Sequence, residues 1–192
     1  MGHHGAGAFR PLPVPVHGST HLPFLGATVE AQRMALEADP TFREAKDLAG
    51  GSIGLKCARA QALISYRSFQ RYQLTQCEPD PDTMFAGRVA SYERYQGEKL
   101  VRRGFDAYSY FTLCNALDSH NVGRGRGGVK AALQTIQASC TILAVDSDLI
   151  FPPFEGREWA SWIPNARYIE ISSEFGHDGF FLEIAKLSAL ML

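Results

Sequence analysis

The amino-acid sequence predicts an α/β protein in which a block of helices precedes a C-terminal strand–helix–strand–helix unit. Residues 140–145 and 167–171 are short runs of apolar and β-branched side chains, typical of buried strands. A helical pattern separates these two runs, and another follows the second. From residue 27 up to the first run, the apolar residues recur mainly with the spacing of amphipathic helices.

The composition is that of an ordinary globular protein. The chain has 192 residues, of which 45% are hydrophobic and 20% charged, and its formal net charge is −1. This charge balance predicts neither a nucleic-acid partner nor a membrane surface. No apolar run approaches the ~18 residues that a transmembrane helix needs. The four cysteines show no CxxC spacing, so we expect reduced thiols in a cytoplasmic protein.

Residues 1–26 differ from the rest of the chain. They combine several prolines and glycines with four of the six histidines. The segment lacks the cationic and apolar regions of a signal peptide, and its histidines have no ligand spacing with a structured partner. We therefore predict a disordered leader and no metal site.

Residues 27–139 form the predicted helical region. A short helix over 27–38 is stopped by Asp39-Pro40, and a long helix follows over 55–76. The pattern predicts two more helices, at 89–103 and 107–117.

A glycine- and arginine-rich turn ends the helical region. Residues 123–128 match G-x-G-x-x-G, but a helix end and a loop precede them, whereas a dinucleotide-binding turn must follow a strand. We therefore interpret the segment as a turn leading into a helix at 129–136. The helix N-terminus and the two arginines still leave open an anion-binding role for Arg124 or Arg126.

Residues 140–192 form the predicted strand–helix–strand–helix unit, with helices at 154–163 and 178–190. Asp146-Ser147-Asp148 follows the first strand, and Gly176-His177-Asp178 follows the second. An acid after one strand and a histidine after the next is the chain order of the catalytic triad in the α/β-hydrolase fold. The sequence therefore predicts that Asp148 and His177 converge within hydrogen-bonding distance.

At the level of short runs, the chain from residue 27 to the C-terminus resembles the homoserine O-acetyltransferase family. The matching runs are 54–59 (GLKCAR), 64–67 (ISYR), 95–99 (YQGEK), 105–110 (FDAYSY), 123–128 (GRGRGG), 147–148 (SD) with 151–152 (FP), and 176–178 (GHD). The resemblance implies a partial α/β-hydrolase fold, made of a helical lid and the C-terminal part of the core. It also implies acetyl transfer from acetyl-CoA, a co-substrate and not a cofactor, to L-homoserine in methionine biosynthesis. Family members commonly dimerise through their lid helices, so a homodimer is expected.

By the same resemblance, Asp148 and His177 are the triad acid and base, and Arg59, Tyr66 and Asp178 hold the amino-acid substrate. The chemistry is consistent, because a guanidinium suits an α-carboxylate and a carboxylate suits an α-ammonium. Arg59 and Tyr66 are seven residues apart, so they project from one helix face. Each residue considered alone has another interpretation: Tyr66 could be a core residue, and Arg59 could lie on a solvated helix surface.

The sequence contains no serine in the setting that a catalytic nucleophile requires. Ser52 lies in a G-x-S-x-G match, but the preceding residues 42–49 are charged and helix-prone, whereas a nucleophile turn needs a buried strand before it. We reject Ser52 and expect a shortened form that lacks the nucleophilic serine and is inactive alone. A related serine O-acetyltransferase, a homoserine O-succinyltransferase and a non-catalytic fragment remain alternatives.

Two further expectations depend on the resemblance. Gly104 is an insertion relative to the family pattern, in which the basic residue runs straight into Phe-Asp, so the helix should break there. Arg124 or Arg126 could contact a phosphate of CoA, and an ordinary structural turn is the alternative.

Overall fold

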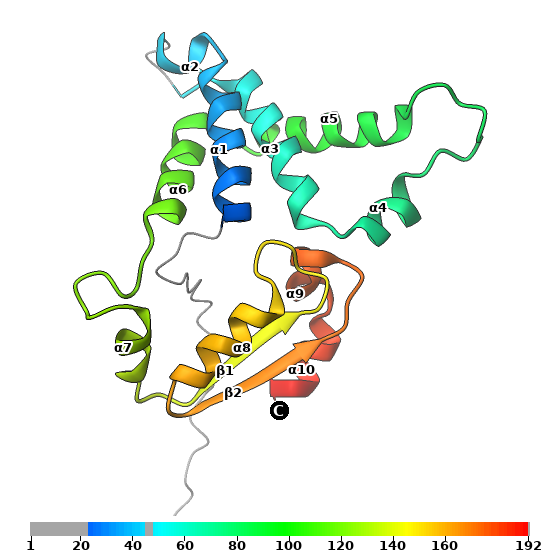
Figure 1. Cartoon of the computed structure of the whole chain (residues 1–192). Helices are drawn as coiled ribbons and strands as arrows, with labels where there is room; N and C mark the ends of the chain where they lie inside the picture. The colour runs from blue at the N-terminus through cyan, green and yellow to red at the C-terminus, as the bar shows by residue number, and fades with distance from the viewer. Residues whose placement is uncertain (1–22, 45–47, 192) are drawn as a thin grey trace, which may run out of the picture.

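The computed structural model describes residues 23–44 and 48–191. A block of helices forms one half of the molecule, and a parallel pair of strands flanked by helices forms the other (Figure 1). The predicted α/β class and the order of its two parts are confirmed.

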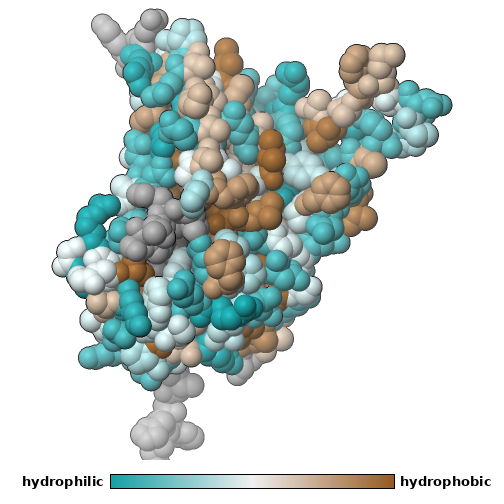
Figure 2. All heavy atoms as spheres, in the orientation of Figure 1, coloured by the Kyte–Doolittle hydropathy of each residue, from teal (hydrophilic) through white to brown (hydrophobic). Residues whose placement is uncertain are grey.

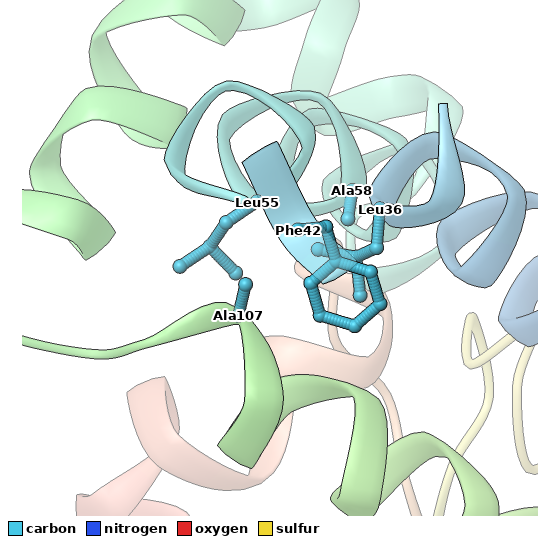
Figure 3. Close-up of a cluster of buried hydrophobic side chains, with 5 residues drawn as sticks. All are labelled: Leu36, Phe42, Leu55, Ala58 and Ala107. Atoms are coloured by element: carbon cyan, nitrogen blue, oxygen red, sulfur yellow. The ribbon is translucent and has the colours of Figure 1, made fainter. Parts of the chain in front are cut away.

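The centre of the helical block is formed by α1 (Pro23–Glu37), α2 (Thr41–Glu44) and α3 (Ser52–Tyr66). Its core is a buried apolar cluster to which α6 also contributes (Figure 3). The members of this cluster are Leu36, Phe42, Leu55, Ala58 and Ala107.

Asp39 ends α1 and also caps α3. Its carboxylate accepts hydrogen bonds from the backbone N–H groups of Ile53 and Gly54, each at 3.0 Å. Burial alone would raise the pKa of Asp39, but these hydrogen bonds and those from Thr41 lower it below its ordinary value. A single side chain therefore links the end of α1 to the start of α3.

The leader boundary and the first long helix need correction. Pro23 to Gly26, assigned to the leader, are the first turn of α1, where proline is well accommodated. Residues 1–22 lie outside the described residues. The helix predicted over 55–76 is two helices, because Arg67 is extended (φ −113°, ψ 147°) and Ser68 caps a new helix, α4 (Phe69–Gln76).

Helix α5 (Gly87–Arg102) crosses α3 at close range. A Cβ atom at Gly97 would lie 2.6 Å from the carbonyl oxygen of Lys56, so the two backbones meet without a side chain between them. The break expected at Gly104 is confirmed: this residue has φ +79°, and α6 (Ala107–Ser119) begins after the capping residue Asp106. Together, α4, the loop after it and α5 form an arm on one side of the molecule (Figure 1).

The glycine-rich turn leads into α7 (Val129–Gln134), which is shorter than predicted. Within the turn, Arg124 donates to the carbonyl of Ser119 at 2.7 Å, and Arg126 donates to that of Val122 at 2.9 Å. The two guanidinium groups thus bind the backbone of their own turn, and a role for either in anion binding stays a prediction.

The strands are β1 (Cys140–Val145) and β2 (Ala166–Ile171), which pair in parallel with Cys140 opposite Ala166 and Val145 opposite Ile171. Helix α8 (Pro153–Trp162) connects the strands and packs on both of them. The helix predicted over 178–190 is three short pieces: η1 (Gly176–Asp178), α9 (Gly179–Leu182) and α10 (Ile184–Met191). The break between α9 and α10 falls at Glu183 (φ −91°, ψ 38°).

All four cysteines are free thiols: Cys114 is buried, whereas Cys57 and Cys77 are exposed. Within residues 23–44 and 48–191, no helix is both long and apolar enough to cross a membrane.

Replacing Gly97 by alanine tests the close crossing of α3 and α5. The added methyl group meets the Lys56 carbonyl, so we expect a loss of about 1–2 kcal/mol in unfolding free energy despite alanine's higher helix propensity. Gly87→Ala is the matched control, because its Cβ would have only a side-chain atom at 3.8 Å nearby. Urea unfolding of both variants makes the comparison, and equal stability would contradict the crossing.

Candidate functional site

Asp148 and His177 meet beyond the carboxyl ends of the two strands. The Asp148 Oδ2 atom lies 2.8 Å from the His177 Nδ1 atom. The other carboxylate oxygen, Oδ1, accepts the backbone N–H groups of Ile150 at 2.8 Å and Phe151 at 3.0 Å. Asp148 is buried, and both of its oxygens have partners, so the carboxylate has a fixed orientation. The predicted convergence of these two side chains is confirmed; their catalytic roles stay predictions.

Aromatic rings surround the imidazole of His177. The ring centroids of Tyr66, Phe151 and Phe180 lie 5.6, 5.3 and 5.1 Å from that of His177. With an ionised Asp148, Nδ1 carries the proton and the Nε2 lone pair is left as a base. The imidazole is thus oriented both by a carboxylate and by packing.

Side-chain hydrogen bonds hold the turn that carries His177 against β1. Asp146 accepts the N–H of Ser173 at 3.0 Å, and Ser147 accepts that of Gly176 at 3.0 Å. The Ser147 hydroxyl also donates to the Ser173 carbonyl. The two residues before Asp148 therefore fix the second strand's turn, a role that the sequence prediction did not assign to them.

The break between α3 and α4 docks on the same turn. The Ser68 hydroxyl donates to the carbonyl of Glu174, and Arg71 pairs with the Glu174 carboxylate at 3.3 Å. A Cβ atom at Gly176 (φ +65°) would lie 2.7 Å from the backbone nitrogen of Ser68, so only glycine fits there without displacement. The helix break therefore has a tertiary cause: it makes room for the turn that carries His177.

Arg59 and Tyr66 share one face of α3, as predicted. The Arg59 guanidinium carbon lies 5.4 Å from the Tyr66 ring centroid. Burial raises the pKa of the Tyr66 hydroxyl, and the positive charge of Arg59 opposes this shift. The hydroxyl thus stays protonated at neutral pH.

Asp178 has a partner that the sequence prediction did not include. Its Oδ2 atom lies 3.4 Å from the Nε atom of Arg67, whose guanidinium also packs over the Tyr92 ring at 5.1 Å. Arg67 follows Tyr66 directly, and only the helix break turns it toward Asp178. No periodic pattern could have predicted this contact.

Beside Arg67, a polar pair connects α4 with α5. The Tyr72 hydroxyl donates to the Glu93 carboxylate at 2.5 Å. Burial raises the pKa of Glu93, while the hydrogen bond from Tyr72 and the charges of Arg67 and Arg59 oppose the shift. Arg59 and Arg67 are therefore both close enough to the half-buried Glu93 carboxylate to affect its pKa.

An apolar pocket of about 300 Å³ adjoins the imidazole. It lies between α1, α3, α6 and the loop after β1, and both Tyr66 and His177 line it. Arg59 and Asp178 do not line it. Figure 2 shows hydrophobic residues gathered where the helical block meets the strand unit.

Ser52 is not placed to act with His177. It is the first residue of α3 and follows a turn, not a strand. Tyr66, which contacts His177, is at the other end of this helix, about 21 Å away at the usual rise per residue. Ser65 is the serine in the pocket wall, and its hydroxyl donates to the Ala62 carbonyl at 2.8 Å.

Ser68→Ala tests the docking of the helix break. The variant loses the cap of α4 and the bond to Glu174, so we expect a loss of about 2 kcal/mol in unfolding free energy and faster amide exchange at residues 174–178. Asp106→Ala is the control, because it removes a cap from α6 alone and should cost about 1 kcal/mol. Unchanged exchange at residues 174–178 in Ser68→Ala would argue against the docking.

No family model matches the chain. The homoserine O-acetyltransferase of Cyclobacterium marinum is 40% identical over 162 residues, which are 84% of this chain and 45% of that protein. That of Chlorobaculum tepidum is 36% identical, covering 97% of this chain and 51% of that protein. The chain thus spans about half the length of the curated relatives it matches.

Solved structures of homoserine O-acetyltransferases also match this chain over about half of their own length. The homoserine O-acetyltransferase of Bacillus anthracis superposes with a TM-score of 0.77 at 15% identity, over 88% of this chain and 48% of that one. That of Staphylococcus aureus gives 0.65 at 28% identity, over 88% and 45%. The chain is therefore similar to the homoserine O-acetyltransferases and has a partial α/β-hydrolase fold that matches about half of theirs.

Proposed function

We propose that this chain provides the acid–base pair and the amino-acid site of a homoserine O-acetyltransferase. The observation that carries the proposal is the bond between Asp148 and His177, at the strand ends where an acyl-transfer triad needs it. In this role, His177 Nε2 accepts the proton of an attacking hydroxyl, and Asp148 stabilises the imidazolium that forms.

Acetyl transfer then proceeds in two steps. A serine hydroxyl loses its proton to His177 and attacks the thioester carbonyl of acetyl-CoA, and the CoA sulfur leaves with that proton. The homoserine hydroxyl next loses its proton to His177 and attacks the carbonyl carbon of the acetyl-serine. The bond between that carbon and the serine oxygen breaks, and the serine oxygen takes the proton back from His177. The acetyl-CoA is consumed as a substrate, and the steps require no further cofactor.

The amino-acid substrate is proposed to lie beside Tyr66. Arg59 suits its α-carboxylate and Asp178 its α-ammonium. The support is the position of Tyr66, which contacts both Arg59 and His177. Because Arg67 already pairs with Asp178, an ammonium group would share this carboxylate with it.

The nucleophile is proposed to come from outside the described residues. Ser65 is in the pocket wall, but it sits within a regular helix and its proton is engaged by Ala62. Such a serine has neither the exposed turn nor the free N–H groups that acyl transfer uses. We further propose that the helical lid region extends from the start of α1 at Pro23 to residue 139 and that residues 140–192 are a part of the hydrolase core.

A hybrid enzyme tests the acid–base pair. Residues 23–192 of this chain replace the matching part of the Cyclobacterium marinum enzyme, and acetylation of L-homoserine is followed. We expect the hybrid to be active, His177→Ala and Asp148→Asn to lower kcat by about 10³–10⁴-fold, and the 192-residue chain alone to be inactive. Arg59→Met should mainly raise the KM for homoserine, whereas Arg157→Met, on the surface of α8, should change nothing. Hybrid activity that survives His177→Ala would refute the proposal. Acetyl transfer by the 192-residue chain alone would indicate that Ser52 is the nucleophile after all.

We also propose that the chain forms a homodimer through the arm formed by α4, α5 and the loop between them. The support is a set of exposed apolar side chains on this arm, which include Leu74, Met84 and Phe85. Figure 2 shows hydrophobic colouring on the arm. We expect light scattering to show a dimer at micromolar concentration, and Phe85→Asp to give a monomer. Ile53→Asp is the control, because Ile53 is equally apolar and exposed but lies on α3. A dimer that persists in Phe85→Asp would place the interface elsewhere.

A further inference from the structure

A cluster of polar side chains lies where the α3–α4 break meets α5, and the proposed steps of acetyl transfer do not use it. Its members are Arg67, Tyr72, Tyr92 and Glu93. The Arg67 guanidinium carbon lies 5.1 Å from the Tyr92 ring centroid, and the rings of Tyr72 and Tyr92 meet edge-on with centroids 6.4 Å apart. Glu93 follows Tyr92 in α5, so a guanidinium and a carboxylate belong to one small group of side chains.

Arg67 has one acid as a partner on η1 and a second acid within electrostatic range on α5. Its Nε atom is 3.4 Å from Asp178 Oδ2, which is long for a charge-assisted hydrogen bond. Arg67 Nε forms no hydrogen bond with any of the described residues. The charge of Arg67 also acts on Glu93, where it opposes the rise in pKa that burial causes. The hold of Asp178 on the guanidinium is therefore loose, and an alternative acid is close.

One oxygen of the Glu93 carboxylate is left to receive a donor. Oε1 accepts the Tyr72 hydroxyl at 2.5 Å, whereas Oε2 is buried and has no hydrogen-bond partner among the described residues. A buried carboxylate oxygen without a hydrogen bond is unfavourable. Arg67 and Glu93 thus each have a buried polar atom without a hydrogen bond to the described part of the chain: a donor on Arg67 and an acceptor on Glu93.

We propose that Arg67 is a positioning residue that moves between two acids: it pairs with Asp178, as the structure shows, and turns to Glu93 when an ammonium group takes its place at Asp178. Two cations beside one carboxylate repel each other, whereas Glu93 Oε2 attracts the displaced guanidinium. Glu93 thereby sets how strongly Asp178 holds an ammonium group. The identification of that group as the α-ammonium of an amino acid rests on the proposed function.

The first test uses the 192-residue chain without any ligand. Asp178→Asn removes the carboxylate that holds Arg67, so the guanidinium should turn to Glu93 and lower the pKa of that side chain. The pKa is read from an NMR titration of the isotope-labelled Glu93 carboxyl group. Arg67→Met should raise this pKa, and in the Arg67→Met background Asp178→Asn should leave it unchanged. A fall of equal size with and without Arg67 would overturn the inference, as would no fall at all.

The hybrid enzyme provides the second test. Glu93→Gln keeps the shape of the side chain and an acceptor for Tyr72, but it weakens the alternative partner of Arg67. We therefore expect the KM for L-homoserine to rise about tenfold with kcat almost unchanged. In an Arg67→Met hybrid the same change should leave KM unaltered, because no guanidinium remains to be displaced. Glu98→Gln is the matched control, because Glu98 is an exposed acid on the same helix, and its KM should equal that of the unaltered hybrid.

An unchanged KM in the Glu93→Gln hybrid would contradict the inference, and so would an equal rise with and without Arg67. These failures are separable from a failure of the proposed function. An active hybrid in which Glu93→Gln has no effect refutes the movement of Arg67 alone. An inactive hybrid refutes the proposed function, and the Glu93 titrations, which need neither substrate nor catalysis, still decide whether Arg67 turns to Glu93.

Discussion

The contact between the α3–α4 break and the turn that carries His177 is the interaction on which the candidate site depends. The Ser68 hydroxyl contributes to this contact in two ways: it caps α4, and it donates a hydrogen bond to the Glu174 carbonyl. Gly176 permits the close approach because it has no side chain. Without this contact, Arg67 would continue the helix and would not face Asp178. The helical block is thus part of the site and not merely its cover.

The site combines two environments that meet at Tyr66 and His177. One is polar and contains Arg59, Arg67 and Asp178, which carry charges of both signs. The other is the apolar pocket between α1, α3 and α6, in whose wall the Tyr110 hydroxyl donates to Gln32.

Much of this could be predicted from the sequence, and the exceptions share a physical cause. The strands at 140–145 and 167–171 and the pairing of Asp148 with His177 follow from local patterns and from chain order. The break at Ser68 does not, because residues 55–76 are helix-prone throughout and only a distant turn interrupts them. The ion pair between Arg67 and Asp178 depends on that break, so the sequence pattern could not predict it either.

The two-stranded sheet has a consequence for handling the protein. Among the residues that the structure describes, each parallel strand bonds to its neighbour on one side only, so β1 and β2 both have an outer edge of backbone donors and acceptors. Such edges pair readily with extended segments of other molecules, and they favour aggregation as concentration rises. Dilute preparations, or a fusion that supplies an adjoining strand, would therefore keep the chain in solution longest.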